Sequence, residues 1–168
     1  MSVGANDVQI RPATEADAQV LFDLILELAG YEKLADQVTG DPEVLRRSLF
    51  EEKAAEALLL ETPDGEAVGY AIFFTTFSTF ECRSGIWLED VYVRPEHRRG
   101  GIGRLVMEHL AQIALDRGHV RLDWVALDWN EPALNFYEKL GARRLDDWLI
   151  HRLEKDGIAR LAAGEGDG

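Results

Sequence analysis

VYVRPEHRRGGIGR, at residues 91–104, takes the chain from an apolar strand through a basic, glycine-rich turn into the start of an amphipathic helix. Glycine lets the backbone adopt positive φ and approach a ligand without a Cβ atom in the way. The N–H groups of such a turn are also the unpaired donors of the first helical turn, where the helix dipole favours an anion. The turn holds three glycines and three arginines, namely Gly100, Gly101, Gly103, Arg98, Arg99 and Arg104. It therefore predicts a phosphate-binding turn, with an ordinary strand-to-helix loop as the alternative.

The spacing of these glycines distinguishes the kinds of phosphate-binding turn. A Rossmann site needs Gly-x-Gly-x-x-Gly and a Walker loop needs Gly-Lys followed by Ser or Thr, and this turn has neither pattern. Its pattern, Arg98-x-x-Gly101-x-Gly103, resembles the pyrophosphate-binding signature Gln/Arg-x-x-Gly-x-Gly/Ala of the GNAT superfamily of acyl-CoA-dependent N-acetyltransferases. The preceding residues 88–93 resemble that family's central strand. The resemblance implies that acetyl-CoA contacts the strand and the turn, at Val91, Val93, Arg98, Arg99, Gly100, Gly101, Gly103 and Arg104.

The composition is that of one acidic globular domain. The 168 residues, 46% of them hydrophobic, suffice for one core, and we expect a domain at 7–162 with flexible tails at 1–6 and 163–168. No stretch approaches the roughly 20 apolar residues of a membrane span and no signal peptide is evident, so we expect a cytoplasmic protein. The net charge of -13 argues against nucleic acid and membrane partners and permits cationic ones. The single cysteine, Cys82, can form no internal disulfide and has no Cys/His neighbours for a metal site, so no metal is expected.

Hydrophobic periodicity and turn residues predict the order βααβββαβαβ. Strands are expected at 8–11, 57–61, 67–77, 86–93 and 120–127, closing strands at 143–145 and 148–153, and a loop at 78–85. Helices are expected from Thr14 to Gly30, from Asp41 through Leu49, at 102–117 and from Asn130 to Gly141, with an unwound tail around 158–161. The order suits a mixed-sheet α/β sandwich. The resemblance implies the GNAT fold, a mixed, mostly antiparallel central sheet with helices on both faces and a splayed pair of central strands.

A closer resemblance covers residues 10–153. The chain resembles the diamine, or spermidine/spermine-type, branch of the GNAT superfamily at residues 10–14 with Asp17, 27–32, 88–90 and 129–137 with Gly141 and Ala142. Relatives that act on thialysine and other small amines share these motifs. The resemblance implies an acetyl-CoA-dependent acetyltransferase of a small cationic amine, such as a diamine, polyamine or lysine-like amine, that works by direct transfer as a homodimer.

Three residues of the last predicted helix are candidates for contact with CoA. Tyr137 lies on an apolar helical stripe, where a core tyrosine with a satisfied hydroxyl group is the alternative. The resemblance implies that Tyr137 is the general acid, which protonates the CoA thiolate as it leaves. Asn130 suits a helix N-cap, and the resemblance also places it against the pantetheine arm, with Asn135 as a weaker CoA contact.

Glu89 and Asp90 interrupt an otherwise apolar strand, and alternation directs one of them into the interior or a cleft. One interpretation is a β-bulge beside the expected strand splay. The other is a general base, because a primary amine with a pKa of ~10.4 arrives protonated and must lose a proton before it attacks a thioester. The resemblance assigns this role to Glu89, with Asp90 in reserve.

Tyr31 and Glu32 follow the first predicted helix, where they could be no more than its polar end. The resemblance implies that they line the amine pocket together with Glu89 and Asp90. Two other functions stay open: acetylation of a protein N-terminus or lysine, and non-catalytic acyl-CoA binding, since a fold does not fix a function.

Overall fold

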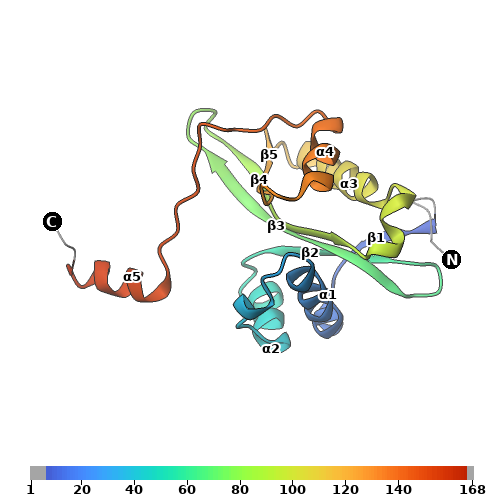
Figure 1. Cartoon of the computed structure of the whole chain (residues 1–168), viewed down its shortest axis with the longest axis horizontal. Helices are drawn as coiled ribbons and strands as arrows, with labels where there is room; N and C mark the ends of the chain where they lie inside the picture. The colour runs from blue at the N-terminus through green and yellow to red at the C-terminus, as the bar shows by residue number, and fades with distance from the viewer. Residues whose placement is uncertain (1–6, 166–168) are drawn as a thin grey trace. The chain divides into compact units, whose positions relative to one another are not determined.

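The computed structural model describes residues 7–165, apart from the side chain of Arg99, and the chain forms two compact units with the boundary between Leu127 and Asp128. The first unit holds the sheet (Figure 1). Its strands are β1 (Gln9–Pro12), β2 (Glu56–Glu61), β3 (Ala67–Ser78), β4 (Arg83–Val93) and β5 (Leu122–Trp124). They lie in the order β1-β2-β3-β4-β5, and every pair is antiparallel except the parallel pair β4 and β5. The predicted mixed, mostly antiparallel sheet is confirmed.

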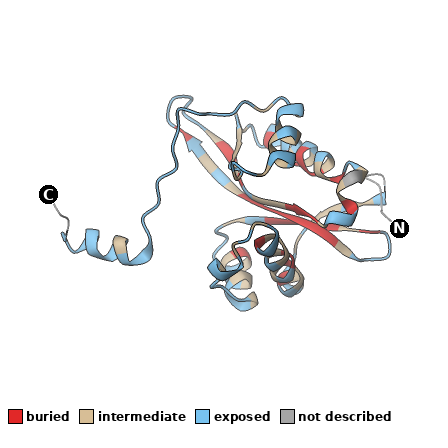
Figure 2. Ribbon diagram, viewed as in Figure 1, coloured by how far each residue is buried: buried red, intermediate tan, exposed pale blue. Residues whose placement is uncertain are grey.

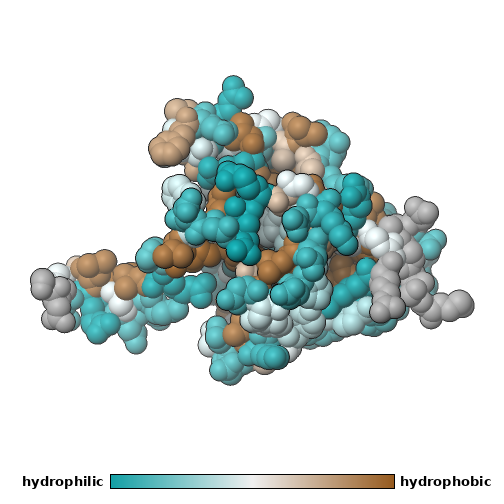
Figure 3. Space-filling view, turned by 45° about the horizontal axis from the view of Figure 1, so that its top comes forward, coloured by the Kyte–Doolittle hydropathy of each residue, from teal (hydrophilic) through white to brown (hydrophobic). Residues whose placement is uncertain are grey.

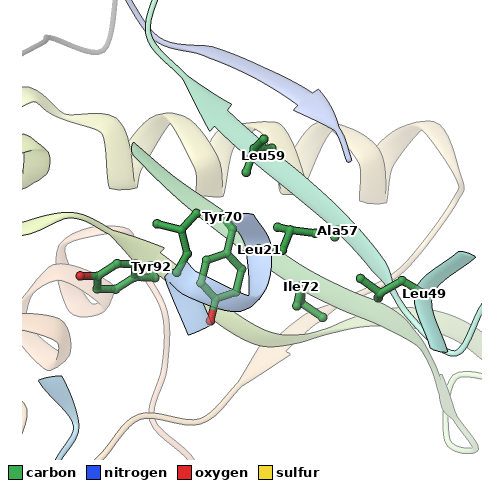
Figure 4. Packing of buried hydrophobic residues seen from close by; sticks show 8 residues of the cluster. Leu21, Leu49, Ala57, Leu59, Tyr70, Ile72 and Tyr92 are labelled. Atoms are coloured by element: carbon green, nitrogen blue, oxygen red, sulfur yellow. The ribbon is translucent and has the colours of Figure 1, made fainter. Parts of the chain in front are cut away.

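Helices of the first unit cover both faces of this sheet. α1 (Ala18–Tyr31) and α2 (Pro42–Arg46) lie on one face, and α3 (Ile102–Asp116) lies on the other (Figure 1). Single turns complete the unit, namely η2 (Glu15–Asp17), η3 (Ala35–Gln37), the π-helical η4 (Arg47–Glu51) and η5 (Pro95–Gly100). Buried residues run along the central strands (Figure 2). On the α1 face the core consists of Leu21, Leu24, Leu49, Ala57, Leu59, Tyr70, Ile72 and Tyr92 (Figure 4).

The hairpin of β3 and β4 is longer than its apolar pattern predicts. Ser78 pairs with Arg83, so only residues 79–82 form the turn, and the predicted loop at 78–85 is wrong. Backbone hydrogen bonds hold a strand pair together even where its side chains face water, whereas the prediction relied on apolar side chains. Cys82 adopts a left-handed φ of 51° in this turn.

β4 contains a bulge at its centre. Leu88 pairs with Phe73 and Asp90 pairs with Ile72, which leaves Glu89 as the extra residue without a partner on β3. On the other edge, the parallel pairing of β4 with β5 ends at Leu88 and Trp124. The two strands therefore separate where the bulge begins, which is the predicted splay. The strand predicted over residues 120–127 is present but shorter, because β5 spans residues 122–124.

The second unit contains α4 (Glu131–Lys139) and α5 (Lys155–Ala162). The strands predicted at 143–145 and 148–153 are absent from the described part of this unit, where Trp148, Leu149 and Ile150 are exposed. Their β-forming side chains are not sufficient, because a strand also needs a neighbouring backbone with which to pair. The predicted unwound tail at 158–161 is also wrong, because these residues form part of α5.

Helix α5 is explained by its composition. Alanine, leucine and arginine at residues 159–162 favour a helix enough to offset Gly157. Figure 3 shows hydrophobic side chains beside hydrophilic ones on its surface, and Ile158 and Leu161 are exposed. The predicted tail at 1–6, and residues 166–168 of the predicted tail at 163–168, lie outside the described residues. Among the described helices, none is both long and apolar enough to cross a membrane.

Candidate active site

The glycine-rich turn forms as the sequence predicts. β4 runs into the 3-10 turn η5, and Gly101 then caps α3 with a left-handed φ of 79°. The α-helical hydrogen bonding begins at once, because Leu105 N–H donates to the Gly101 carbonyl oxygen at 3.1 Å. The backbone N–H groups that open α3 therefore belong to a first helical turn, which has no intrahelical acceptor for them. A left-handed residue before a helix start is a geometry that suits an anion.

Arg98 lies across the base of this turn. Its Nε donates a hydrogen bond of 2.8 Å to the carbonyl oxygen of Val93, at the end of β4. Its guanidinium group lies 4.3 Å from the ring centroid of Tyr31 and 5.5 Å from that of Tyr92. These cation–π contacts join the turn to the end of α1. The side chain of Arg98 thus connects the end of β4 to the end of α1. Arg104 instead lies on the surface, in an exposed ion pair with Glu108.

The two carboxylates of the bulge have different surroundings. Glu89 is exposed and accepts a hydrogen bond of 2.9 Å from the indole N–H of Trp87. Asp90 is partly buried and accepts a hydrogen bond of 3.4 Å from the Tyr70 hydroxyl group. Burial and the nearby charges of Glu89 and Glu32 raise the pKa of Asp90 to about 6. The Asp90 carboxyl group therefore binds a proton more tightly than an ordinary aspartate.

Tyr31 and Glu32 stand at the end of α1, as the last helical residue and its C-cap. Burial raises the pKa of the Glu32 carboxyl group. The charge of Glu32 in turn raises the pKa of Asp90, so the two carboxyl groups interact. The structure thus brings Glu32 within electrostatic reach of Asp90, from which it is distant in the sequence, and Asp90 is also within reach of Glu89.

In the second unit, Asn130 caps α4 as predicted. Its Oδ1 accepts a hydrogen bond of 3.4 Å from the backbone N–H of Ala133, and Pro132 occupies the first turn. Tyr137 lies on α4 with its ring centroid 5.3 Å from that of Phe136. Tyr137 is partly exposed, which differs from a fully buried core tyrosine, and Asn135 is exposed.

Tyr70 is the residue of this site that the sequence pattern did not single out. It lies in an apolar run on β3, where its alternation indicates only a core position. Its side chain is fully buried, yet its hydroxyl group reaches Asp90. The hydroxyl group of a buried tyrosine usually needs a hydrogen-bond partner, so a tyrosine in an apolar strand indicates a polar group nearby. Among the described residues, no group of three His, Cys, Asp or Glu residues is placed to hold a metal ion.

The sequence pattern of the family described as Acetyltransferase (GNAT) family matches residues 25–142. The chain belongs to this family. It is therefore an acyl-CoA-dependent N-acetyltransferase, and the predicted GNAT fold and enzyme class are confirmed.

Relatives of this acetyltransferase confirm the resemblance to the diamine branch. The chain is similar to thialysine N-epsilon-acetyltransferase of Bos taurus, with 40% identity over 167 residues that cover 92% of this chain and 97% of the relative. It is 27% identical to the spermidine/spermine N(1)-acetyltransferase-like protein 1 of Homo sapiens over 164 residues, which cover 92% of this chain and 24% of that protein. Among solved structures, the integron cassette protein VCH_CASS6 from the mobile metagenome of V. cholerae superposes with a TM-score of 0.78 at 26% identity, covering 93% of this chain and 98% of that chain.

Proposed function

We propose that this acetyltransferase transfers the acetyl group of acetyl-CoA directly to a primary amine of a small cationic substrate, namely a diamine, a polyamine or a lysine-like amine. The observation that carries the proposal is the cluster of Glu32, Glu89 and Asp90, in which the charges of Glu32 and Glu89 act on a partly buried Asp90. Such a cluster favours a ligand with more than one ammonium group. The names of the thialysine and ornithine acetyltransferases among its relatives support the same substrate class.

The proposed cofactor site consists of the end of β4 and the start of α3. The N–H groups at Gly101 and Gly103 bind the pyrophosphate, with Gly100, Arg98, Arg99 and Arg104 around it. Backbone groups of Val91 and Val93 hold the pantetheine arm and polarise the thioester carbonyl. Asn130 and Asn135 make the remaining contacts with CoA. No metal takes part in this proposal.

The reaction then needs three proton transfers, because the substrate nitrogen loses two protons and the CoA thiolate gains one. A carboxylate of the bulge, Glu89 or Asp90, accepts a proton from the substrate ammonium, and the freed lone pair attacks the thioester carbon. The C–S bond breaks as the amide forms, and the thiolate takes a proton from Tyr137. The nitrogen then gives up its second proton, which restores the Tyr137 hydroxyl group. Overall, an ammonium and acetyl-CoA give an N-acetyl amine, CoA thiol and one proton. Tyr31 and Glu32 hold the distal part of the amine.

We also propose that residues 7–162 act as one catalytic domain, in a homodimer in the cytoplasm. The family pattern supports a single domain, because it spans residues 25–142 and so includes parts of both compact units. The homodimer and the location rest on the resemblance to the diamine branch. Light scattering tests the dimer, which requires a molar mass twice that of one chain.

Acetyl-CoA consumption tests the substrate class, with polyamines, lysine analogues, monoamines and peptides compared at equal concentration. Diamines should give the highest kcat/KM. Glu32→Gln should lower kcat/KM for diamines and leave monoamines nearly unchanged, because distal charge contacts also orient the reacting end. Glu52→Gln removes the same charge from an exposed residue and serves as the control. Preference for peptides, or a silent Glu32→Gln, would refute the small-amine proposal.

A further inference from the structure

The hydroxyl group of Tyr70 lies in the core of the first unit and reaches only one of the two bulge carboxylates. We propose that Tyr70 is a positioning residue, which holds Asp90 so that Asp90, rather than Glu89, accepts the proton of the substrate amine. This inference rests on the proposed function and assigns the base within it.

The geometry fixes the Tyr70 hydroxyl group in place. The side chain is 0% exposed and belongs to the core cluster that α1 covers. Its ring lies 6.3 Å from that of Tyr92, and Figure 4 shows the two hydroxyl groups pointing in different directions. The Tyr92 hydroxyl group donates to Glu27 at 3.2 Å, whereas that of Tyr70 donates to Asp90 at 3.4 Å. Because close packing restricts the ring, Tyr70 offers Asp90 a donor at a constant position.

The bulge determines which carboxylate Tyr70 meets. Tyr70 pairs with Tyr92, and two residues further along β3, Ile72 pairs with Asp90. Asp90 therefore sits on the regular part of the hairpin, beside its partner strand. Glu89 is the extra residue, is exposed, and takes its hydrogen bond from Trp87. A base that is held by the core and shielded from bulk water is better suited to take a proton from a bound ammonium than one on the surface.

The charges around Asp90 are consistent with this role. Glu89 on its own strand and Glu32 after α1 both raise its pKa, in addition to burial, while Tyr70 on β3 opposes them through its hydrogen bond. The resulting pKa of about 6 keeps Asp90 ionised at pH 7 yet basic enough to receive a proton. The proton moves from the substrate nitrogen to a carboxylate oxygen of Asp90, and then to water after the amide has formed.

The test is the pH dependence of kcat/KM for the amine at saturating acetyl-CoA. Tyr70→Phe removes only the hydroxyl group, so the acid limb of the profile should move up by about one pH unit, and the rate should recover at higher pH. Tyr92→Phe is the matched control, since it removes a neighbouring hydroxyl group that bonds to Glu27, and its acid limb should not move. A purely structural loss would lower the rate equally at every pH.

Two further variants separate the carboxylates. Asp90→Asn should abolish the acid limb and lower kcat by about 10² to 10⁴, whereas Glu89→Gln should keep the limb. The inference is overturned if the acid limb of the kcat/KM profile does not move in Tyr70→Phe, or if Glu89→Gln is the only variant that loses this limb. Either result leaves the acetyltransferase function intact. Wild-type enzyme that acetylates no small amine overturns the proposed function, and this role of Asp90 with it.

Discussion

Replacing Asp90 with asparagine should stabilise the fold at pH 7, although it removes a residue of the proposed site. The pKa of Asp90 is raised from 3.8 to about 6, mainly by burial. Each pH unit of such a difference corresponds to about 1.4 kcal/mol, and solvent reaches part of this side chain. Ionised Asp90 therefore costs the folded state about 1 to 3 kcal/mol at pH 7. Asparagine has nearly the same shape, and its amide oxygen can still accept from Tyr70.

The sign of the effect depends on pH. Below about pH 3 Asp90 is protonated in both the folded and the unfolded chain, so the cost is absent. It grows as pH rises from about 4 to 6 and is constant above that range. The Tm of Asp90→Asn should therefore lie much closer to that of the wild type at pH 4 than at pH 7, where it should be higher by about 2 to 4 °C for each kcal/mol.

Calorimetry at both pH values, in the absence of acetyl-CoA, measures this difference. Asp64→Asn is the control, because Asp64 is exposed in the turn between β2 and β3 and asparagine suits the same turn position. Two results would refute the argument that burial of the ionised Asp90 carboxylate destabilises the fold. One is an Asp90→Asn variant that is less stable than wild type at pH 7, and the other is a variant that is stabilised as much at pH 4 as at pH 7.

Three further predictions concern the strand, the turn and the helix of the second unit. Gly69→Ala should cost about 1–3 kcal/mol in a urea titration, because its Cβ would overlap the carbonyl oxygen of Tyr92; Gly30→Ala, with nothing within 4 Å, should instead gain about 0.5–1 kcal/mol. Gly101→Val should abolish the thermal shift with acetyl-CoA, which is about 2.7 kcal/mol at 100 times Kd; Gly118→Val strains a similar positive φ at the far end of α3 and should keep the shift. Tyr137→Phe should lower kcat by about 10² to 10⁴ without loss of acetyl-CoA affinity in steady-state kinetics, and unchanged turnover would remove Tyr137 from the proton transfer.

The parts of the fold that local sequence determines were predictable. Helix α3 and the turn before it follow from glycine chemistry at Gly101 and an apolar stripe, both of which act within a few residues. The N-cap of α4 at Asn130 is equally local. The interruption at Glu89 and Asp90 left two readings open, a bulge and a functional site. The bulge is present, and it places the two carboxylates in unlike environments.

Features that depend on distant partners were not predictable. The contact of Tyr70 with Asp90 requires the register between β3 and β4, which the bulge alters. The cation–π contact of Arg98 with Tyr31 joins residues 67 positions apart, and from the sequence alone the same arginine resembles a phosphate ligand. The expected strand at 148–153 has suitable side chains, but pairing depends on a neighbouring backbone that no local pattern reveals.

The bulge at Glu89 also bears on how the gene can change. Leu88 and Asp90 face neighbouring residues of β3, Phe73 and Ile72, so an in-frame deletion of the Glu89 codon joins two residues whose partners are already adjacent. All the remaining pairs of the hairpin can keep their register after such a deletion. An insertion of this kind can therefore be lost or regained in evolution without rebuilding the sheet. One codon is enough to separate a regular hairpin from one that presents two carboxylates side by side where the strands divide.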